Sequence, residues 1–183
     1  SDGAGGMPRY TEAVDCIKIL QKVDLAVAAT KFTQNQIKEK YNMAVPYIPI
    51  GVDTNTFFPL KDYEREFLRL NAEVETCDVG KVMIKGALKD KFIIGSVFRN
   101  QPRKFPDRII KTAKMLKYHY KIDNFMFLLH TDPNDVAQTC DLKFYARENG
   151  VADKIFFTGM NYFNGFPSSR MNEVYNTFDI FYL

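Results

Sequence analysis

The sequence predicts an α/β protein built on a Rossmann-like parallel sheet with helices on both faces. From residue 92 onward, short apolar and β-branched runs alternate regularly with amphipathic helical segments. Strands that alternate with helices of this length form a parallel sheet, because each helix provides the long connection that parallel strands need. In addition, 46% of the 183 residues are hydrophobic and 26% are charged, which is the balance of a globular chain rather than a disordered one.

The first fifty residues predict a small α/β segment. A helix is expected over 10–23, and a second over 31–41 with Thr30 as its N-cap. The apolar runs 25–29 and 45–49 are expected to be short strands. The second of these runs contains prolines, which favour the edge of a sheet.

The stretch 51–60 predicts a boundary between two domains. It combines Gly51 and the turn-favouring Asp53 with two adjacent phenylalanines, which is typical of a linker held against a domain. We therefore expect residues 1–50 to belong to one domain and residues 61–183 to another.

The second domain is expected to hold most of the sheet. It begins with a helix over 62–71, followed over 72–90 by a surface excursion with no recognisable pattern. Strands are then predicted over 92–98, 125–129, 154–158 and 178–183, with helices over 107–121, 136–149 and 168–177 between them. Gly150 is expected to end the second of these helices as a C-cap, and Ser168 or Ser169 to cap the third.

A basic loop follows the strand 92–98. Arg99, Arg103 and Lys104 lie between this strand and the helix that begins at Asp107. In an open parallel sheet the carboxyl ends of the strands form the rim at which ligands bind. Cations at that rim suit a phosphate-bearing ligand. The alternative interpretation is a solvated loop that happens to be basic.

Several classes of function find no support in the sequence. It contains no G-x-G-x-x-G, no G-x-x-x-x-G-K-[ST] and no D-x-D, and no His/Asp cluster with the spacing of metal ligands. Cys16, Cys77 and Cys140 are too far apart for a zinc knuckle or a disulfide framework. The net charge of +3 is too weak and dispersed to predict nucleic-acid binding. No apolar run approaches the roughly 18 residues of a membrane span. The few, widely spaced cysteines favour a reducing compartment, and we expect a cytoplasmic protein.

Five blocks of the sequence, in the same order, resemble retaining glycosyltransferases of the GT-B fold, and more narrowly those of group 1 (family 4). V-F-R-N-Q-P-R-K at 97–104 is similar to the family's donor-phosphate loop. The run 47–59, Y-I-P-I-G-V-D-T-N-T-F-F-P, is similar to its interdomain segment. The stretch 23–33 resembles a strand of the family with the start of the helix that follows it. The stretch 151–159 resembles the strand before the nucleobase loop, and 171–183 resembles the helix and strand before the catalytic segment.

The resemblance implies roles for individual residues. Arg99 and Lys104 would hold the diphosphate of a UDP- or GDP-type nucleotide sugar and stabilise the charge of the leaving nucleotide, without a metal or other cofactor. The base-binding loop would contain Gly159, Met160 and Asn161, the hinge would contain Gly51, Val52 and Asp53, and the wall of the donor site would contain Asn100 and His130.

The resemblance also implies that the 183 residues are a fragment. Residues 1–50 would be the end of the N-terminal acceptor domain, and 61–183 an incomplete C-terminal donor domain whose E-x7-E segment would follow Leu183. We expect no sugar transfer by this fragment alone, and its acceptor is unknown. Phe98 and Phe105 stand where the family often has glycine. The alternative is a non-transferase nucleotide-binding module, such as an epimerase-like GT-B relative or a regulatory binder.

The predicted helix 107–121 carries a basic stripe. It consists of Lys111, Lys114, Lys117 and Lys121. We interpret the stripe as a solvated face. The alternative is that it attracts the protein weakly to anionic lipid at the inner face of the membrane.

Overall fold

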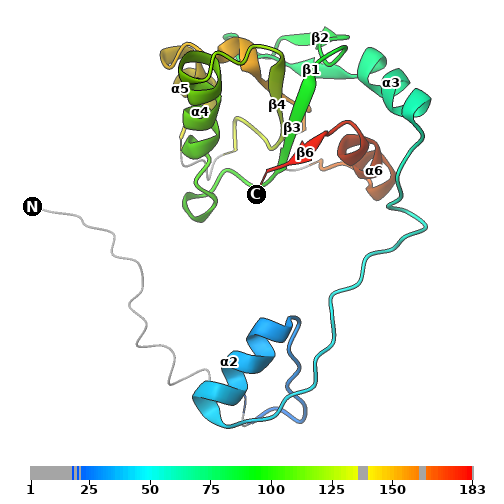
Figure 1. Ribbon diagram of the computed structural model, residues 1–183, viewed down its shortest axis with the longest axis vertical. Coiled ribbons are helices and arrows are strands. Elements are labelled where there is room, and N and C mark those ends of the chain that lie inside the picture. Colours follow the sequence, from blue (N-terminus) through cyan, green and yellow to red (C-terminus); the bar gives the residue numbers. More distant parts are fainter. Residues whose placement is uncertain (1–17, 19, 21, 136–139, 161–163, 183) are drawn as a thin grey trace, which may run out of the picture. The chain divides into compact units, whose positions relative to one another are not determined.

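The computed structural model describes residues 18, 20, 22–135, 140–160 and 164–182 (Figure 1). The chain divides into two compact units, Ser1–Val52 and Asp53–Leu183. This division falls within the stretch 51–60 that the sequence predicts as a linker.

The described part of the first unit contains one complete helix, α2 (Lys31–Tyr41). Thr30 is its N-cap, as predicted, and the Thr30 hydroxyl accepts a hydrogen bond from the Thr33 amide at 3.0 Å. The predicted strands 25–29 and 45–49 meet in a single parallel bridge between Ala28 and Tyr47. These runs are therefore shorter as strands than predicted. Most of the expected helix 10–23 lies outside the described residues.

The second unit contains a six-stranded sheet. Its strands are β1 (Glu73–Glu75), β2 (Met83–Lys85), β3 (Phe92–Val97), β4 (Phe125–His130), β5 (Ile155–Phe157) and β6 (Ile180–Phe181). They are arranged in the order β2-β1-β5-β4-β3-β6. The strands β5, β4, β3 and β6 are parallel, whereas β1 is antiparallel to both β5 and β2. The sheet is thus mixed rather than entirely parallel as predicted.

The two antiparallel strands come from the stretch 72–90, which was expected to be a surface excursion. Side chains of α5 (Leu142–Glu148) hold this hairpin in place. Lys143 binds the buried Glu75 carboxylate, and the Arg147 guanidinium donates to the Cys77 carbonyl. Strands of three residues are too short to show a periodic pattern, and partners about seventy positions away cannot be recognised from the local sequence.

Four α-helices belong to the described part of this unit. They are α3 (Asp62–Asn71), α4 (Asp107–Lys114), α5 and α6 (Ser168–Asn176). The predicted helix 107–121 is divided, because α4 continues as a π-helical segment, Met115–His119. The start of the predicted helix 136–149 lies outside the described residues, and α5 begins after Asp141, whose carboxylate accepts from the Phe144 amide at 2.9 Å.

The ends of α5 and α6 test the predicted caps. Gly150 directly follows Asn149, the C-cap of α5, with a φ of +68°, a left-handed conformation that glycine adopts without strain. The predicted glycine at the end of this helix is thus confirmed, one position beyond the C-cap itself. In contrast, α6 begins after Pro167 without a side-chain cap, so the predicted cap at Ser168 or Ser169 is wrong.

Helices cover both faces of the sheet, as predicted, and β4 shows how (Figure 1). Its alternate side chains Phe125, Phe127 and Leu129 belong to a core that also contains residues of α4 and α5. Met126 and Leu128 point to the opposite face and belong to a second core with residues of α6. A strand buried on both faces reads as a continuous apolar run, which explains why β4 was predictable.

The connections give the sheet a topological switch point. From β3 the chain passes through α4 to β4 and then on to β5, whereas β6 lies on the other side of β3. In open α/β sheets, ligands bind beyond the carboxyl ends of the strands at such a point. The fold therefore directs attention to the carboxyl ends of β3 and β6.

Candidate functional site

Two cavities open at the carboxyl ends of the parallel strands. The first, here called the Arg99 cavity, has a volume of about 330 Å³. Its lining comes from the last residues of β3 and β4 and from the loops that follow β3, β4 and β5, and comprises Val97, Phe98, Arg99, His130, Thr131, Asp132, Asp135 and Met160. Three residues predicted for the donor site, Arg99, His130 and Met160, are thus brought together from three separate parts of the chain.

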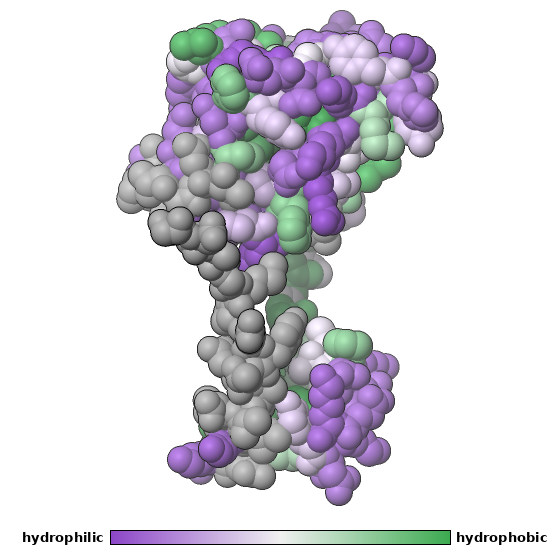
Figure 2. Space-filling model, turned by 90° about the vertical axis from the view of Figure 1, so that its left-hand side faces the viewer, coloured by the Kyte–Doolittle hydropathy of each residue, from purple (hydrophilic) through white to green (hydrophobic). Residues whose placement is uncertain are grey.

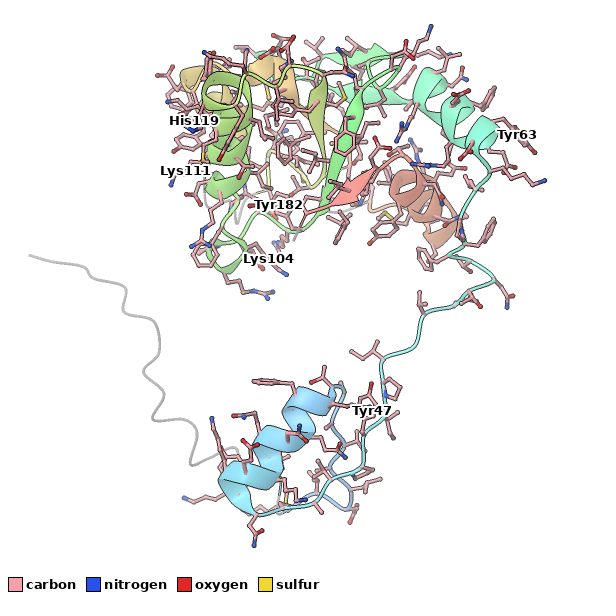
Figure 3. The ribbon with its side chains drawn as sticks, in the orientation of Figure 1. Tyr47, Tyr63, Lys104, Lys111, His119 and Tyr182 are labelled. Carbon is pink, nitrogen blue, oxygen red and sulfur yellow. The ribbon has the colours of Figure 1, made fainter. Side chains whose placement is uncertain are left out.

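The second cavity, here called the Arg108 cavity, has a volume of about 310 Å³. It is lined by Ser96, Val97, Phe98, Arg103, Lys104, Phe105, Arg108, Ile109 and Tyr182. Figure 3 shows Lys104 and Tyr182 at the same end of the unit. The two cavities share the wall formed by Val97 and Phe98, so Arg99 and Lys104 line neighbouring cavities rather than a common one.

Arg99 is fixed by an ion pair. Its Nε atom lies 2.7 Å from Oδ2 of Asp135 and its Nη2 atom lies 3.3 Å from Oδ1. The Asp135 side chain is 1% exposed. A two-point contact with a buried carboxylate holds the guanidinium in one orientation and neutralises its charge.

His130 forms the wall between the Arg99 cavity and the core. Its Nδ1 atom lies 2.9 Å from the Thr158 hydroxyl, and its ring meets the edge of Phe166 at a centroid distance of 5.0 Å. Burial lowers the pKa of His130 from its ordinary value of 6.5, and the positive charge of Arg170 lowers it further. The imidazole is therefore neutral at physiological pH.

We expect the stability of the protein to depend on His130 as the pH falls. Because the folded-state pKa is lowered, the unfolded chain binds a proton first, and stability decreases as the pH falls below the ordinary histidine pKa of 6.5 and through the lowered folded-state pKa. Urea denaturation across this range should give a smaller decrease for His130→Asn. His119→Asn, at the exposed second histidine, is the control for the loss of an imidazole. An unchanged slope in His130→Asn would contradict the assignment.

Thr131 and Asn100 are fully buried next to these residues. The Thr131 hydroxyl lines the Arg99 cavity and has no hydrogen-bond partner within the described part of the chain. In contrast, the Asn100 amide donates to the Cys140 carbonyl at 2.8 Å and fastens the loop after β3. Asn100, expected in the wall of the donor site, is not among the described residues that line the Arg99 cavity.

The remaining predicted site residues are more dispersed. Gly159 has a φ of +72° just beyond β5, and Asn161 lies outside the described residues. Gly51 and Val52 are exposed. The Asp53 carboxylate accepts hydrogen bonds from the Asn55 amide and the Thr56 hydroxyl, which lowers the pKa of Asp53. Asp53 therefore forms a local turn at the start of the second unit.

The end of the predicted linker is bound to α6. The Phe58 amide donates to Oδ1 of Asn172 at 3.1 Å, and the Leu60 amide donates to Oδ1 of Asn176 at 2.8 Å. This part of the stretch 51–60 is therefore held against the second unit.

The basic stripe is partly neutralised. Lys111 lies 2.7 Å from Asp107, and Lys117 lies 2.7 Å from Asp153. Lys114 donates to the Asn149 side chain instead. The face that carries α4 and α5 is largely hydrophilic (Figure 2), as expected for a solvated surface. No helix in the described ranges has the length and apolar character needed to cross a membrane.

Metal ligands were sought among the described residues, and the sequence was compared with known proteins. The described residues contain no group of three or more His, Cys, Asp or Glu side chains that could hold a metal ion. Comparison of the sequence with models of known protein families and with curated proteins finds no match.

Two important residues, Asp135 and Arg108, were not singled out by their sequence context. Asp135 follows β4 by five positions, and only the folded loop brings it to Arg99. Arg108 lies in the first turn of α4, where the sequence pattern assigns it simply to an exposed helical face. The proximity of Arg108 to the loop cations was the available signal, because a helix that starts directly after a strand loop places its first turn at the ligand rim.

Proposed function

We propose that the second unit is the nucleotide-sugar-binding domain of a retaining, metal-independent glycosyltransferase with a GT-B fold. The observation that supports this most directly is the Arg99 cavity. Arg99, His130 and Met160, which the resemblance assigns to the donor site, line it together at the carboxyl ends of three adjacent parallel strands. This is the position at which open α/β sheets bind nucleotides.

The proposal divides the ligand between the two cavities. The nucleoside lies in the Arg99 cavity beside Met160, and the diphosphate extends toward Lys104 across the wall formed by Val97 and Phe98. During transfer, fixed cations would stabilise the negative charge that develops on the departing nucleotide. The donor is a UDP- or GDP-sugar, and the acceptor binds outside these two cavities. The proposed location of the enzyme is the cytoplasm or the inner face of the membrane.

Calorimetric titration with UDP and GDP tests the nucleotide site. One nucleotide should bind, and Lys104→Ala should weaken its binding by about 1.5–3 kcal/mol, the usual loss for a hydrogen bond to a charged group. The double variant Arg99→Ala and Asp135→Asn should lose binding free energy in the same range. Asp135 is replaced as well, because Arg99→Ala alone would leave a charged carboxylate buried without its cation. Lys85→Ala, on β2 at the opposite edge of the sheet, is the control. Equal affinities for all of these proteins would refute the donor-site assignment.

Metal independence and transfer are tested separately. UDP or GDP should bind with the same affinity in EDTA as in Mg²⁺ if protein cations alone meet the diphosphate. A purely regulatory nucleotide binder would pass this test as well. The transferase is distinguished by retention of anomeric configuration in the product formed by the full enzyme.

A further inference from the structure

The charges of the two cavities differ sharply. The described lining of the Arg99 cavity contains one cation, Arg99, together with the carboxylates of Asp132 and Asp135 and the neutral imidazole of His130. The described lining of the Arg108 cavity contains three cations, Arg103, Lys104 and Arg108, and no acidic side chain. An anionic group is therefore attracted to the Arg108 cavity and meets excess negative charge in the other.

Within the part of the chain that the structure describes, none of the three cations of the Arg108 cavity forms an ion pair at contact distance, although the charge of Arg108 also acts on the neighbouring Asp107 carboxylate. The ion pairs of the second unit involve other cations, such as Arg65, Arg69 and Arg99. Arg103 contacts the neutral amide oxygen of Gln101, at 3.2 Å. Binding an anion here requires none of these ion pairs to be broken, in contrast to binding at the Arg99–Asp135 contact.

The loop around Phe105 positions one of these cations. Phe105 has a φ of +48°, a left-handed conformation that is uncommon for a residue with a side chain. It directly follows the 3₁₀ turn Pro102–Lys104, and the Arg108 guanidinium stacks over its ring at 4.3 Å. The turn and the stacking interaction together hold Arg108 at the edge of the cavity before any ligand arrives.

The Arg108 cavity also occupies the topological switch point. Ser96, Val97 and Phe98 are at the carboxyl end of β3, and Tyr182 directly follows β6. Tyr182 is bound to β3, because its amide donates to the Gly95 carbonyl and its carbonyl accepts from the Ser96 hydroxyl, both at 2.8 Å. The position favoured for ligands by the topology coincides with the position favoured for anions by charge.

We infer that the Arg108 cavity is the diphosphate-binding site and that Arg103 and Arg108 act there with Lys104, whereas Arg99 does not contact the phosphates. The diphosphate site itself does not depend on the proposed function. Only the attachment of this diphosphate to a nucleoside rests on that function. Three cations around one cavity with an apolar floor of Val97 and Ile109 suit a diphosphate without a metal ion.

Binding of inorganic pyrophosphate, followed by calorimetry, tests this site without a nucleoside. We expect Arg108→Gln and Arg103→Gln each to weaken pyrophosphate binding about tenfold or more. Arg99→Ala combined with Asp135→Asn should change it less than about twofold, although the same double variant should weaken UDP or GDP binding. Lys111→Gln is the matched control, since Lys111 lies on the same helix but is paired with Asp107, and it should bind as the wild type.

The outcomes separate the site from the proposed function. Wild-type affinity for pyrophosphate in both Arg108→Gln and Arg103→Gln, absence of pyrophosphate binding by the wild type, or a larger loss in the Arg99 double variant would each overturn the inference. If pyrophosphate binding depends on Arg103 and Arg108 but neither UDP nor GDP binds more tightly than pyrophosphate, the diphosphate site stands and the nucleotide-sugar function fails. Two variants from different turns ensure that a folding defect in one leaves the test intact.

Discussion

Replacing Lys143 by methionine is expected to lower the free energy of unfolding by about 3–5 kcal/mol, because it leaves a buried carboxylate without its cation. Lys143 Nζ lies 2.7 Å from Oε1 of Glu75, and the two side chains are 9% and 2% exposed. The same ammonium donates to the Gly80 carbonyl at 2.6 Å. The variant therefore loses both the ion pair and a contact that holds the turn between β1 and β2.

A double variant and a surface variant make this prediction specific. Glu75→Gln combined with Lys143→Met removes the charge that was left unpaired, so it should recover a substantial part of the stability. Lys111→Met breaks a pair with the same 2.7 Å separation, but its side chains are 59% and 38% exposed, so solvent screens the pair and the loss of stability should be far smaller. Urea denaturation followed by circular dichroism measures all three. Similar losses for Lys143→Met and Lys111→Met would mean that burial does not control the cost.

The Lys143–Glu75 pair also illustrates what the sequence could and could not predict. Elements whose pattern is contained in a single segment were recognised: α2 and α3 have the predicted bounds although neither contains a buried residue, and β3 and β4 agree with their predicted strands within a residue. Their signal is local, because side-chain periodicity can be read within one segment without knowing its tertiary partners. The hairpin β1–β2 was missed because what stabilises it is a pair of charges 68 positions apart, which leaves no local pattern.

In the candidate site, too, locally encoded features were predicted and features that depend on tertiary contacts were not. The basic loop and the position of His130 at the end of β4 were evident from strand patterns. The sequence suggested that Arg99 and Lys104 would act as one pair. Their placement in neighbouring cavities depends on the buried Asp135 carboxylate and on the left-handed turn at Phe105. Both are tertiary features, and neither is indicated by residue spacing.

Gly95, in the strand that leads to both cavities, should tolerate no larger residue. A Cβ atom at this position would overlap the ring of Phe178, far inside van der Waals contact. Phe178 is 8% exposed, and its ring stacks on Phe181 at a centroid distance of 6.2 Å. The ring therefore has little room to withdraw, and Gly95→Ala should destabilise the protein by about 1–3 kcal/mol or more through overpacking.

Gly51→Ala provides a matched control for this substitution. A Cβ atom added at Gly51 would meet no other atom within 4 Å, and the φ of Gly51 is not positive. The same added methyl group should therefore change the unfolding free energy by less than about 0.5 kcal/mol. If Gly95→Ala and Gly51→Ala have equal effects in urea denaturation, the close approach of Phe178 does not limit the residue at position 95.

A second substitution at Phe178 separates overpacking from a direct effect on the strand. Phe178→Leu alone should be destabilising because it removes buried ring atoms. Combined with Gly95→Ala, it gives the new methyl group space, so the double variant should lose less stability than the sum of the two single variants.

Because Gly95 pairs with Phe181 of β6 and precedes Ser96 at the Arg108 cavity, Gly95→Ala should also weaken pyrophosphate binding, and the double variant should restore part of it. Strict additivity in stability, or pyrophosphate binding that is unaffected by Gly95→Ala, would show that the Gly95–Phe178 contact does not shape the switch point.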